Sequence, residues 1–100
     1  MTIQPKRLRK FKIETDCIRT LVGIGTPFRV TTKFSSEMHR TGYFLSDVRH
    51  VAVTGRVVRS DMLEDLGLWD VRGTTISGVT LTIRFALDSV EGYIEPIKFL

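Results

Sequence analysis

The chain has very few of the residues that usually build metal or redox sites. Cys17 is its single cysteine, and its two histidines are His39 and His50. One cysteine cannot form an intramolecular disulfide, and these three residues do not have the close paired spacing of a zinc motif. We therefore expect no metal and no cofactor. Because Cys17 stands among aliphatic residues, we expect its thiol to be buried rather than reactive.

The sequence also lacks a long apolar run. Its apolar stretches, such as "VAV" at 51–53, are far shorter than the roughly 20 residues that cross a bilayer, and no signal-peptide core follows Met1. A chain of 100 residues, 42% hydrophobic and 26% charged, is typical of one ordinary globular domain. We expect a cytoplasmic protein without a membrane partner.

Positive charge is concentrated at the start of the chain. Segment 1–12 carries five of the 15 basic residues and no acidic one, so the remaining 10 basic and 11 acidic residues leave the body at −1. We therefore divide the chain into a basic N-terminal arm, 1–12, and a single domain, 13–100. The basic residues of the arm are Lys6, Arg7, Arg9, Lys10 and Lys12. Such an arm can attract RNA phosphates or an acidic protein surface, or it can be a solvated leader.

Apolar periodicity predicts two or three helices in the first half of the chain. One covers 12–25, with Thr15 as its N-cap, and a second covers 31–42. A third begins at Ser46, a good N-cap residue, and ends near Gly55. Its inward residues would be Val48, Val51 and Ala52.

Alternation of apolar and polar residues predicts strands in the second half. The strand segments are 56–60, 68–73, 79–87 and 92–100. Segment 60–67, "SDMLEDLG", is interpreted as a loop, and Pro96 favours an edge strand or a bulge because proline cannot donate to the ladder. The predicted fold class is α+β, with the helices packed on one face of a twisted antiparallel sheet of about four strands.

The polar face of this sheet is the first candidate site. Residues expected to point away from the helices are Thr80, Thr82 and Arg84. Neighbouring strands would add Arg72 or Asp70, and either Arg56 or Arg59. Several arginines on an open sheet could bind phosphates and stabilise the charge that develops when a ribose 2′-hydroxyl attacks its own phosphodiester. A polar solvated face without a function is the alternative, because antiparallel sheets commonly have one.

The remaining polar and aromatic residues favour structural roles. His39 stands near the end of the second helix, and His50 follows Asp47 by three positions, which suits a weak local hydrogen bond. Neither histidine has a visible catalytic partner. Trp69 and Tyr93 are interpreted as packing or rim residues; the alternative is a base-stacking platform, because an aromatic residue beside arginines would suit single-stranded RNA.

Residues 17 to 99 resemble a known family in the order and spacing of their elements. Three stretches carry the resemblance: "IRTLVGIGTPFRVTTK", "LSDVRHVAVTGRVV" and "WDVRG…SGVTLTIRF". They are similar to the MqsR branch of the RelE-like toxin superfamily and to a related group of small bacterial proteins of unknown function. The resemblance implies a compact domain found in toxin–antitoxin systems and on mobile elements. Its active members cleave mRNA without metal, using a few Lys, Arg, Gln, Tyr or His side chains on the sheet.

The residues that match the family's functional positions are mostly different in this chain. Where the uncharacterised group has a histidine and two arginines, this chain has Lys33, Glu37 and Thr41. The MqsR glutamine is matched by Asp70, and the tyrosine by Thr80 or Leu81. Arg84 is the one plausible counterpart of a family cation.

Two hypotheses follow. The first is a RelE/MqsR-like toxin-type protein that acts on RNA, as a metal-independent endoribonuclease if active. Its catalytic residues would be Arg84, Arg72 and Lys33, while the arm, Arg56 and Arg59 would bind RNA or a partner. The second is a non-catalytic interaction module from a mobile element, a regulator or inhibitor that binds a host or phage protein. An antitoxin or another protein is the expected partner in either case.

Overall fold

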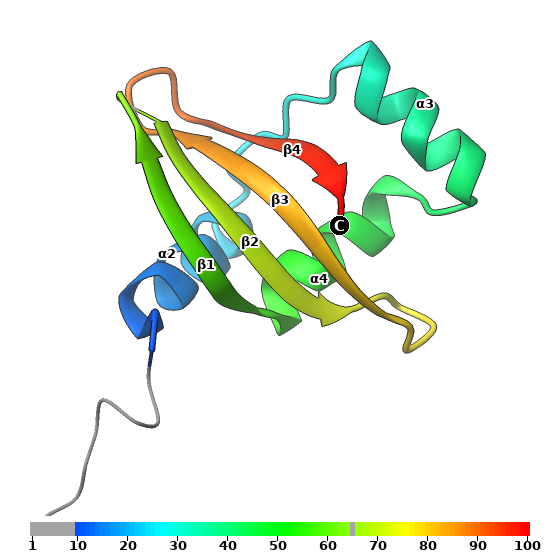
Figure 1. Ribbon diagram of the computed structural model, residues 1–100, viewed down its shortest axis with the longest axis horizontal. Coiled ribbons are helices and arrows are strands. Elements are labelled where there is room, and N and C mark those ends of the chain that lie inside the picture. The colour runs from blue at the N-terminus through cyan, green and yellow to red at the C-terminus, as the bar shows by residue number, and fades with distance from the viewer. Residues whose placement is uncertain (1–9, 65) are drawn as a thin grey trace, which may run out of the picture.

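The computed structural model describes residues 10–64 and 66–100 and contains three helices followed by four strands (Figure 1). The helices are α2 (Lys12–Gly23), α3 (Thr32–Thr41) and α4 (Leu45–Thr54). The strands are β1 (Arg56–Leu63), β2 (Leu66–Thr74), β3 (Thr80–Asp88) and β4 (Tyr93–Phe99). The predicted α+β class is confirmed. Within the described ranges, no helix has the length and apolar character needed to cross a bilayer.

The four strands form one antiparallel sheet in the order β1-β2-β3-β4, so each strand pairs with its neighbour in the chain. Helices α2 and α4 lie behind the sheet in Figure 1, α3 lies beyond β4, and none of the described helices lies on the front face. We call the helix side the covered face and the other side the open face. The predicted edge position of Pro96 is confirmed, since it lies on β4.

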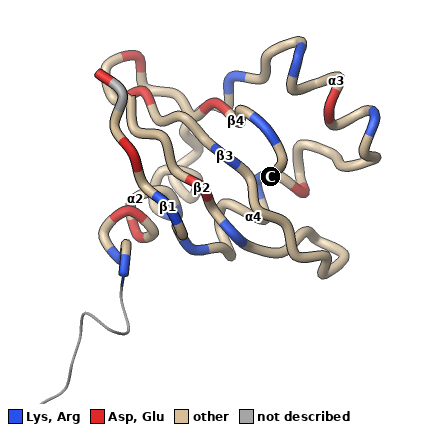
Figure 2. Tube along the Cα trace, in the orientation of Figure 1, with Lys and Arg blue, Asp and Glu red and all other residues tan. Residues whose placement is uncertain are grey.

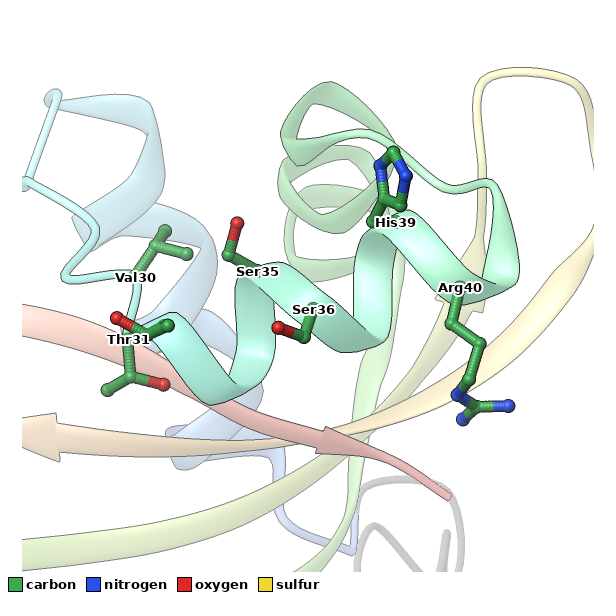
Figure 3. A pocket seen from close by; sticks show the side chains of 7 residues that line it. Val30, Thr31, Ser35, Ser36, His39 and Arg40 are labelled. Atoms are coloured by element: carbon green, nitrogen blue, oxygen red, sulfur yellow. The ribbon is translucent and has the colours of Figure 1, made fainter.

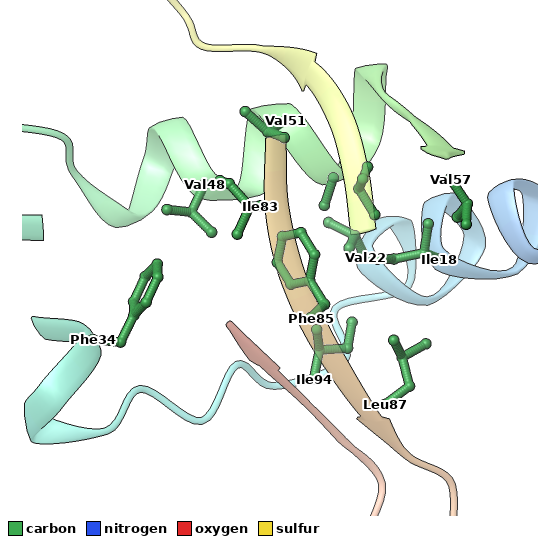
Figure 4. Packing of buried hydrophobic residues seen from close by; sticks show 12 residues of the cluster. Ile18, Val22, Phe34, Val48, Val51, Val57, Ile83, Phe85, Leu87 and Ile94 are labelled. Atoms are coloured by element: carbon green, nitrogen blue, oxygen red, sulfur yellow. The ribbon is translucent and has the colours of Figure 1, made fainter. Parts of the chain in front are cut away.

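The core lies between the covered face and the helices, with Phe85 at its centre (Figure 4). The expected alternation on β3 is present, because Ile83 and Phe85 are fully buried while Arg84 between them is not. Helix α3 contributes one buried residue, Phe34, whose ring stacks on Phe99 with centroids 5.0 Å apart. The sheet and α4 are therefore tied together by many side chains, while α3 is held mainly by Phe34, with the half-buried Met38 also packed against the core.

Two predicted helix starts are wrong. Thr15 lies inside α2, which begins after Phe11, and the buried Thr15 Oγ1 accepts a hydrogen bond of 2.9 Å from the Val57 backbone N–H. That amide belongs to the edge strand β1 and has to be hydrogen-bonded when it is buried. Thr15 therefore serves as its acceptor and does not cap the helix. Helix α4 begins one residue before Ser46. There, the Asp47 carboxylate accepts from the Phe44 N–H, so Asp47 provides the capping contact.

The predicted loop at 60–67 is also wrong. β1 continues to Leu63 and β2 starts at Leu66, so most of the segment pairs across a tight hairpin. Glu64, in the turn, has a φ of 55°. The segment lacks an obvious strand pattern because its polar residues lie at the exposed end of the sheet, where burial does not select for apolar side chains.

Two glycines allow α4 to meet β2 closely. A Cβ at Gly73 would lie 2.5 Å from the Val51 carbonyl oxygen and 2.7 Å from the Gly55 Cα. Arg19 of α2 completes this corner: its Nε and Nη2 donate to the Gly55 carbonyl at 2.9 and 2.6 Å, at the negative end of the α4 dipole. The corner sets where β1 starts, and therefore where Arg56 lies.

Candidate nucleic-acid interface

The open face carries its cations in two adjacent rows that cross the strands. One row follows the register Arg59, Asp70, Arg84 and Lys98, and the next follows Arg56, Arg72 and Thr82. These rows contain five basic residues and one acidic residue. We call Arg56, Arg59, Arg72, Arg84 and Lys98, together with Asp70, the cationic half of the open face. Figure 2 shows this basic region on β1, β2 and β3.

Register irregularities place more cations on this face than strict alternation would. The shift between Val57 and Arg59 means that Arg56 pairs with Arg72 while Arg59 pairs with Asp70, so both arginines of β1 lie on the open face. The sequence predicted only one of the two. A second shift on β4 aligns Lys98 with Arg84. The sequence analysis did not identify Lys98 as a residue of this face. The only sequence feature that could have indicated it is Pro96, where a bulge would shift the register of the residues that follow.

Arg84 is held by Asp70 in a two-pronged ion pair. Its Nε donates to Asp70 Oδ1 at 2.8 Å and its Nη2 donates to Oδ2 at 3.2 Å. The hydrogen bond to Asp70, followed by the attraction of the carboxylate charge, raises the pKa of Arg84 above its ordinary value. Arg84 therefore stays charged and cannot act as a general base. Its Nη1 makes no hydrogen bond to any described residue, so one side of the guanidinium can still bind an anion.

Arg56 and Arg72 form a pair of like charges. They are register partners on neighbouring strands, both are exposed, and neither forms an ion pair with a described carboxylate. Side chains directly opposite each other have Cβ atoms about 5 Å apart, and like charges in this arrangement destabilise the strand pair. An anion bound between the two guanidinium groups would remove this repulsion. Arg59 differs, because its Nε donates to Asp61 at 3.2 Å.

The opposite half of the open face is acidic. Toward the β1–β2 and β3–β4 turns, the next row contains Asp61 and Glu95, and the last row contains Asp88. Figure 2 shows acidic residues gathered around the β1–β2 and β3–β4 turns. Polyanions would therefore be attracted to one half of the face and repelled from the other.

The other predicted binding residues do not all lie on this face. Lys33 is exposed near the start of α3 and forms no ion pair within the described chain, so it does not join Arg84 and Arg72 on the open face. Lys10 lies over the Phe11 ring, and Lys12 pairs with Asp16 on α2. The arm residues Lys6, Arg7 and Arg9 lie outside the described residues.

Neither histidine lies on the open face. His39 is exposed on α3, beside a shallow hollow that is also lined by Ser35, Ser36 and Arg40; His39 and Arg40 point to different sides of the helix (Figure 3). His50 does not bond to Asp47 as expected. Its Nδ1 lies 2.7 Å from the Thr74 carbonyl oxygen and donates to it, which ties α4 to the end of β2.

A groove on the covered face was not predicted from the sequence. It has a volume of about 440 Å³ and lies between α2 and the hairpin end of the sheet. Cys17 and Leu21 line it from α2, and Trp69 and Met62 line it from the sheet. The expected burial of Cys17 is therefore wrong: Cys17 is exposed. Helix α2 turns Ile18 and Val22 toward the core, which leaves Cys17 at the edge of the groove.

Comparison of the chain with models of protein families, with curated proteins and with solved structures finds no match. The described side chains of the open face can bind anions strongly, but they include no histidine to move a proton. Among the described residues, no group of three His, Cys, Asp or Glu side chains could hold a metal ion.

Proposed function

We propose that this protein acts on RNA and holds a single strand across the cationic half of its open face. The observation that carries the proposal is that Arg56 and Arg72 lie opposite each other and neither forms an ion pair with a described carboxylate. A phosphate group bound between them would relieve their mutual repulsion. Lys98 extends the same surface across the sheet, as does the Nη1 of Arg84, which makes no hydrogen bond to a described residue. The acidic residues on the other half of the open face would confine the RNA strand to the cationic half. The basic arm would add attraction that depends on salt but not on sequence.

The order of elements supports a RelE/MqsR-like origin within this proposal. Three helices followed by a four-stranded antiparallel sheet are compatible with the RelE-like fold. A toxin-type protein of that kind would have an antitoxin as its protein partner. A cytoplasmic location is part of the same proposal, because mRNA is the substrate of the active family members.

Cleavage by this face would be metal-independent. Arg84, supported by Arg72, would stabilise the charge that develops on the phosphorus oxygens during attack by the 2′-hydroxyl. That attack also needs a general base, and His39 and His50 both belong to helices rather than to the open face. The described residues therefore support RNA binding more strongly than RNA cleavage, and Lys33 has no role in this arrangement.

Binding can be tested with a fluorescein-labelled single-stranded RNA, measured by fluorescence anisotropy over a range of salt concentrations. Each lost phosphate contact should reduce the slope of log affinity against log salt by about 0.7. We expect Arg72→Gln to do this and Arg56→Gln/Arg72→Gln to reduce the slope by about 1.4. Arg40→Gln is the matched control, because it removes the same charge from α3. Equal slopes for Arg72→Gln and Arg40→Gln would refute the proposed surface.

Induced expression in bacteria separates binding from cleavage. An active endoribonuclease should arrest growth and leave cut transcripts, and Arg84→Gln should abolish both effects. RNA binding without cut transcripts would support a binding protein that has lost the reaction. The second candidate function is the non-catalytic interaction module, which the Arg84–Asp70 pair favours because it occupies two of the guanidinium donors. Absence of RNA binding at low salt would favour that function.

A further inference from the structure

The groove on the covered face is separate from the proposed RNA surface. Its floor is formed by Trp69, Gly67 and Leu87, which lie on the covered side of β2 and β3. The cationic half lies on the other side of the same strands. A ligand in the groove therefore tests a different surface, and the two proposals can fail independently.

The walls of the groove are apolar and partly exposed. Cys17 and Leu21 lie one helical turn apart on α2 and form one wall; Cys17 is exposed and Leu21 is half-buried. Met62, on the opposite wall, is 71% exposed. Large apolar side chains on both sides of a groove are typical of a surface that binds another apolar side chain. The absence of a side chain at Gly67 leaves the Trp69 indole accessible along the floor.

Negative charge lies at the turn end of the groove, which we call its rim. Asp88, the last residue of β3, is the one charged residue among the described residues that line the groove; Glu91 lies in the adjoining β3–β4 turn and Glu64 in the β1–β2 turn, and these two do not line it. None of these three carboxylates forms an ion pair within the described chain; Asp88 Oδ1 accepts only from the backbone N–H groups of its own turn. Arg29 lies over the Tyr93 ring, but it is already bonded to Tyr93 Oη and paired with Glu95.

We propose that this groove binds a cationic, amphipathic segment of a partner protein. A large apolar side chain of that segment would lie between Trp69 and α2. A Lys or Arg about one helical turn away would reach Asp88 or Glu91. The apolar walls supply contact area and the acidic rim selects against acidic segments. The chain's own basic arm and a second copy of the chain are alternative occupants.

Two natural probes make the proposal testable in the full chain. Trp69 is the only tryptophan and Cys17 the only cysteine, and both line the groove. The ligand probe is a synthetic helical peptide of Leu, Lys and Ala, and the matched peptide has Glu in place of Lys. We expect the Lys peptide to shift Trp69 fluorescence and to slow the reaction of Cys17 with Ellman's reagent. The Glu peptide should do neither, and equal responses to both peptides would overturn the proposal.

Substitutions then locate the contact. Glu91→Lys should weaken binding of the Lys peptide roughly three- to tenfold, because it reverses one rim charge. Glu37→Lys makes the same charge change on α3 and should leave the affinity unchanged. Met62→Lys tests the apolar wall at an exposed position that does not affect the core. If neither Glu91→Lys nor Met62→Lys lowers the affinity, the peptide binds elsewhere and the proposal fails.

The same readouts identify the two alternative occupants. If neutralising Lys6, Arg7 and Arg9 to Gln speeds Cys17 modification without any peptide, the arm occupies the groove. If protection of Cys17 increases with protein concentration alone, a second copy occupies it. Either result would overturn the proposal of a partner segment.

Discussion

The contact between Gly73 and the α4–β1 corner makes a sharp prediction about stability. In Gly73→Ala, the new Cβ would lie 2.5 Å from the Val51 carbonyl oxygen, 2.7 Å from the Gly55 Cα and 2.9 Å from the Gly55 nitrogen. All three neighbours are backbone atoms, so none can rotate away as the end of a side chain could. The corner or the strand has to move to make room for the methyl group.

The size of the effect follows from two opposing contributions. Overpacking against a well-packed interior costs about 1–3 kcal/mol, and three backbone contacts place this case at the upper end. Replacing glycine also lowers the entropy of the unfolded chain, which returns up to about 1 kcal/mol. The net loss in the free energy of unfolding is therefore about 2 kcal/mol. For a domain of this length, that corresponds to a decrease in Tm of roughly 8–16 °C.

Gly23→Ala is the matched control for this measurement. Gly23 is the last residue of α2, its φ is not in the left-handed region, and a Cβ there would meet no atom within 4 Å. Its Tm should equal or slightly exceed that of the wild type. Thermal unfolding followed by circular dichroism measures both variants. If Gly73→Ala melts within about 2 °C of Gly23→Ala, the close approach of α4 to β2 is not a constraint and the reasoning is refuted.

Two further predictions concern a buried hydrogen bond and an ion pair. Thr15→Val should lower the free energy of unfolding by about 1–3 kcal/mol in urea titrations, because the Val57 N–H loses its acceptor; exposed Thr20→Val is the control, and equal losses would contradict the role of Thr15. Arg84→Gln should lower Tm by the same amount at about pH 6 and about pH 9. The pKa of Arg84 is raised, so its contribution is complete throughout this range and is lost only when the pH rises through that higher pKa. If the Tm difference between the wild type and Arg84→Gln changes between these two pH values, the raised pKa of Arg84 is contradicted.

The cationic half and the groove lie on opposite faces of the same sheet. β2 supplies Arg72 to the open face and Trp69 to the groove, because successive side chains of a strand point to opposite faces. The hairpin turns carry acidic residues that limit the RNA surface on one side and form the rim of the groove on the other. A partner segment bound in the groove would therefore leave the cationic half accessible.

Several features of this protein could be determined from the sequence alone. The period-two alternation predicted a strand at 79–87, and β3 covers 80–88 with Ile83, Phe85 and Leu87 buried, although Val79 lies before the strand and is exposed. Gly42 correctly marked the end of α3. These predictions succeeded because they depend on local rules: the periodicity of side chains along an element, and the ease with which glycine adopts a positive φ.

The tertiary structure decided the features that depend on contacts between distant residues. Thr15 serves β1 and not its own helix, and Cys17 is exposed because the orientation of α2 is set by Ile18 and Val22 packing on the sheet. The cationic half exists because register shifts add a residue to β1 and to β4, and no local pattern in the sequence specifies where a strand slips. The chain alone therefore predicted a sheet with arginines on it, while long-range pairing determined which charges lie side by side and which face holds a groove.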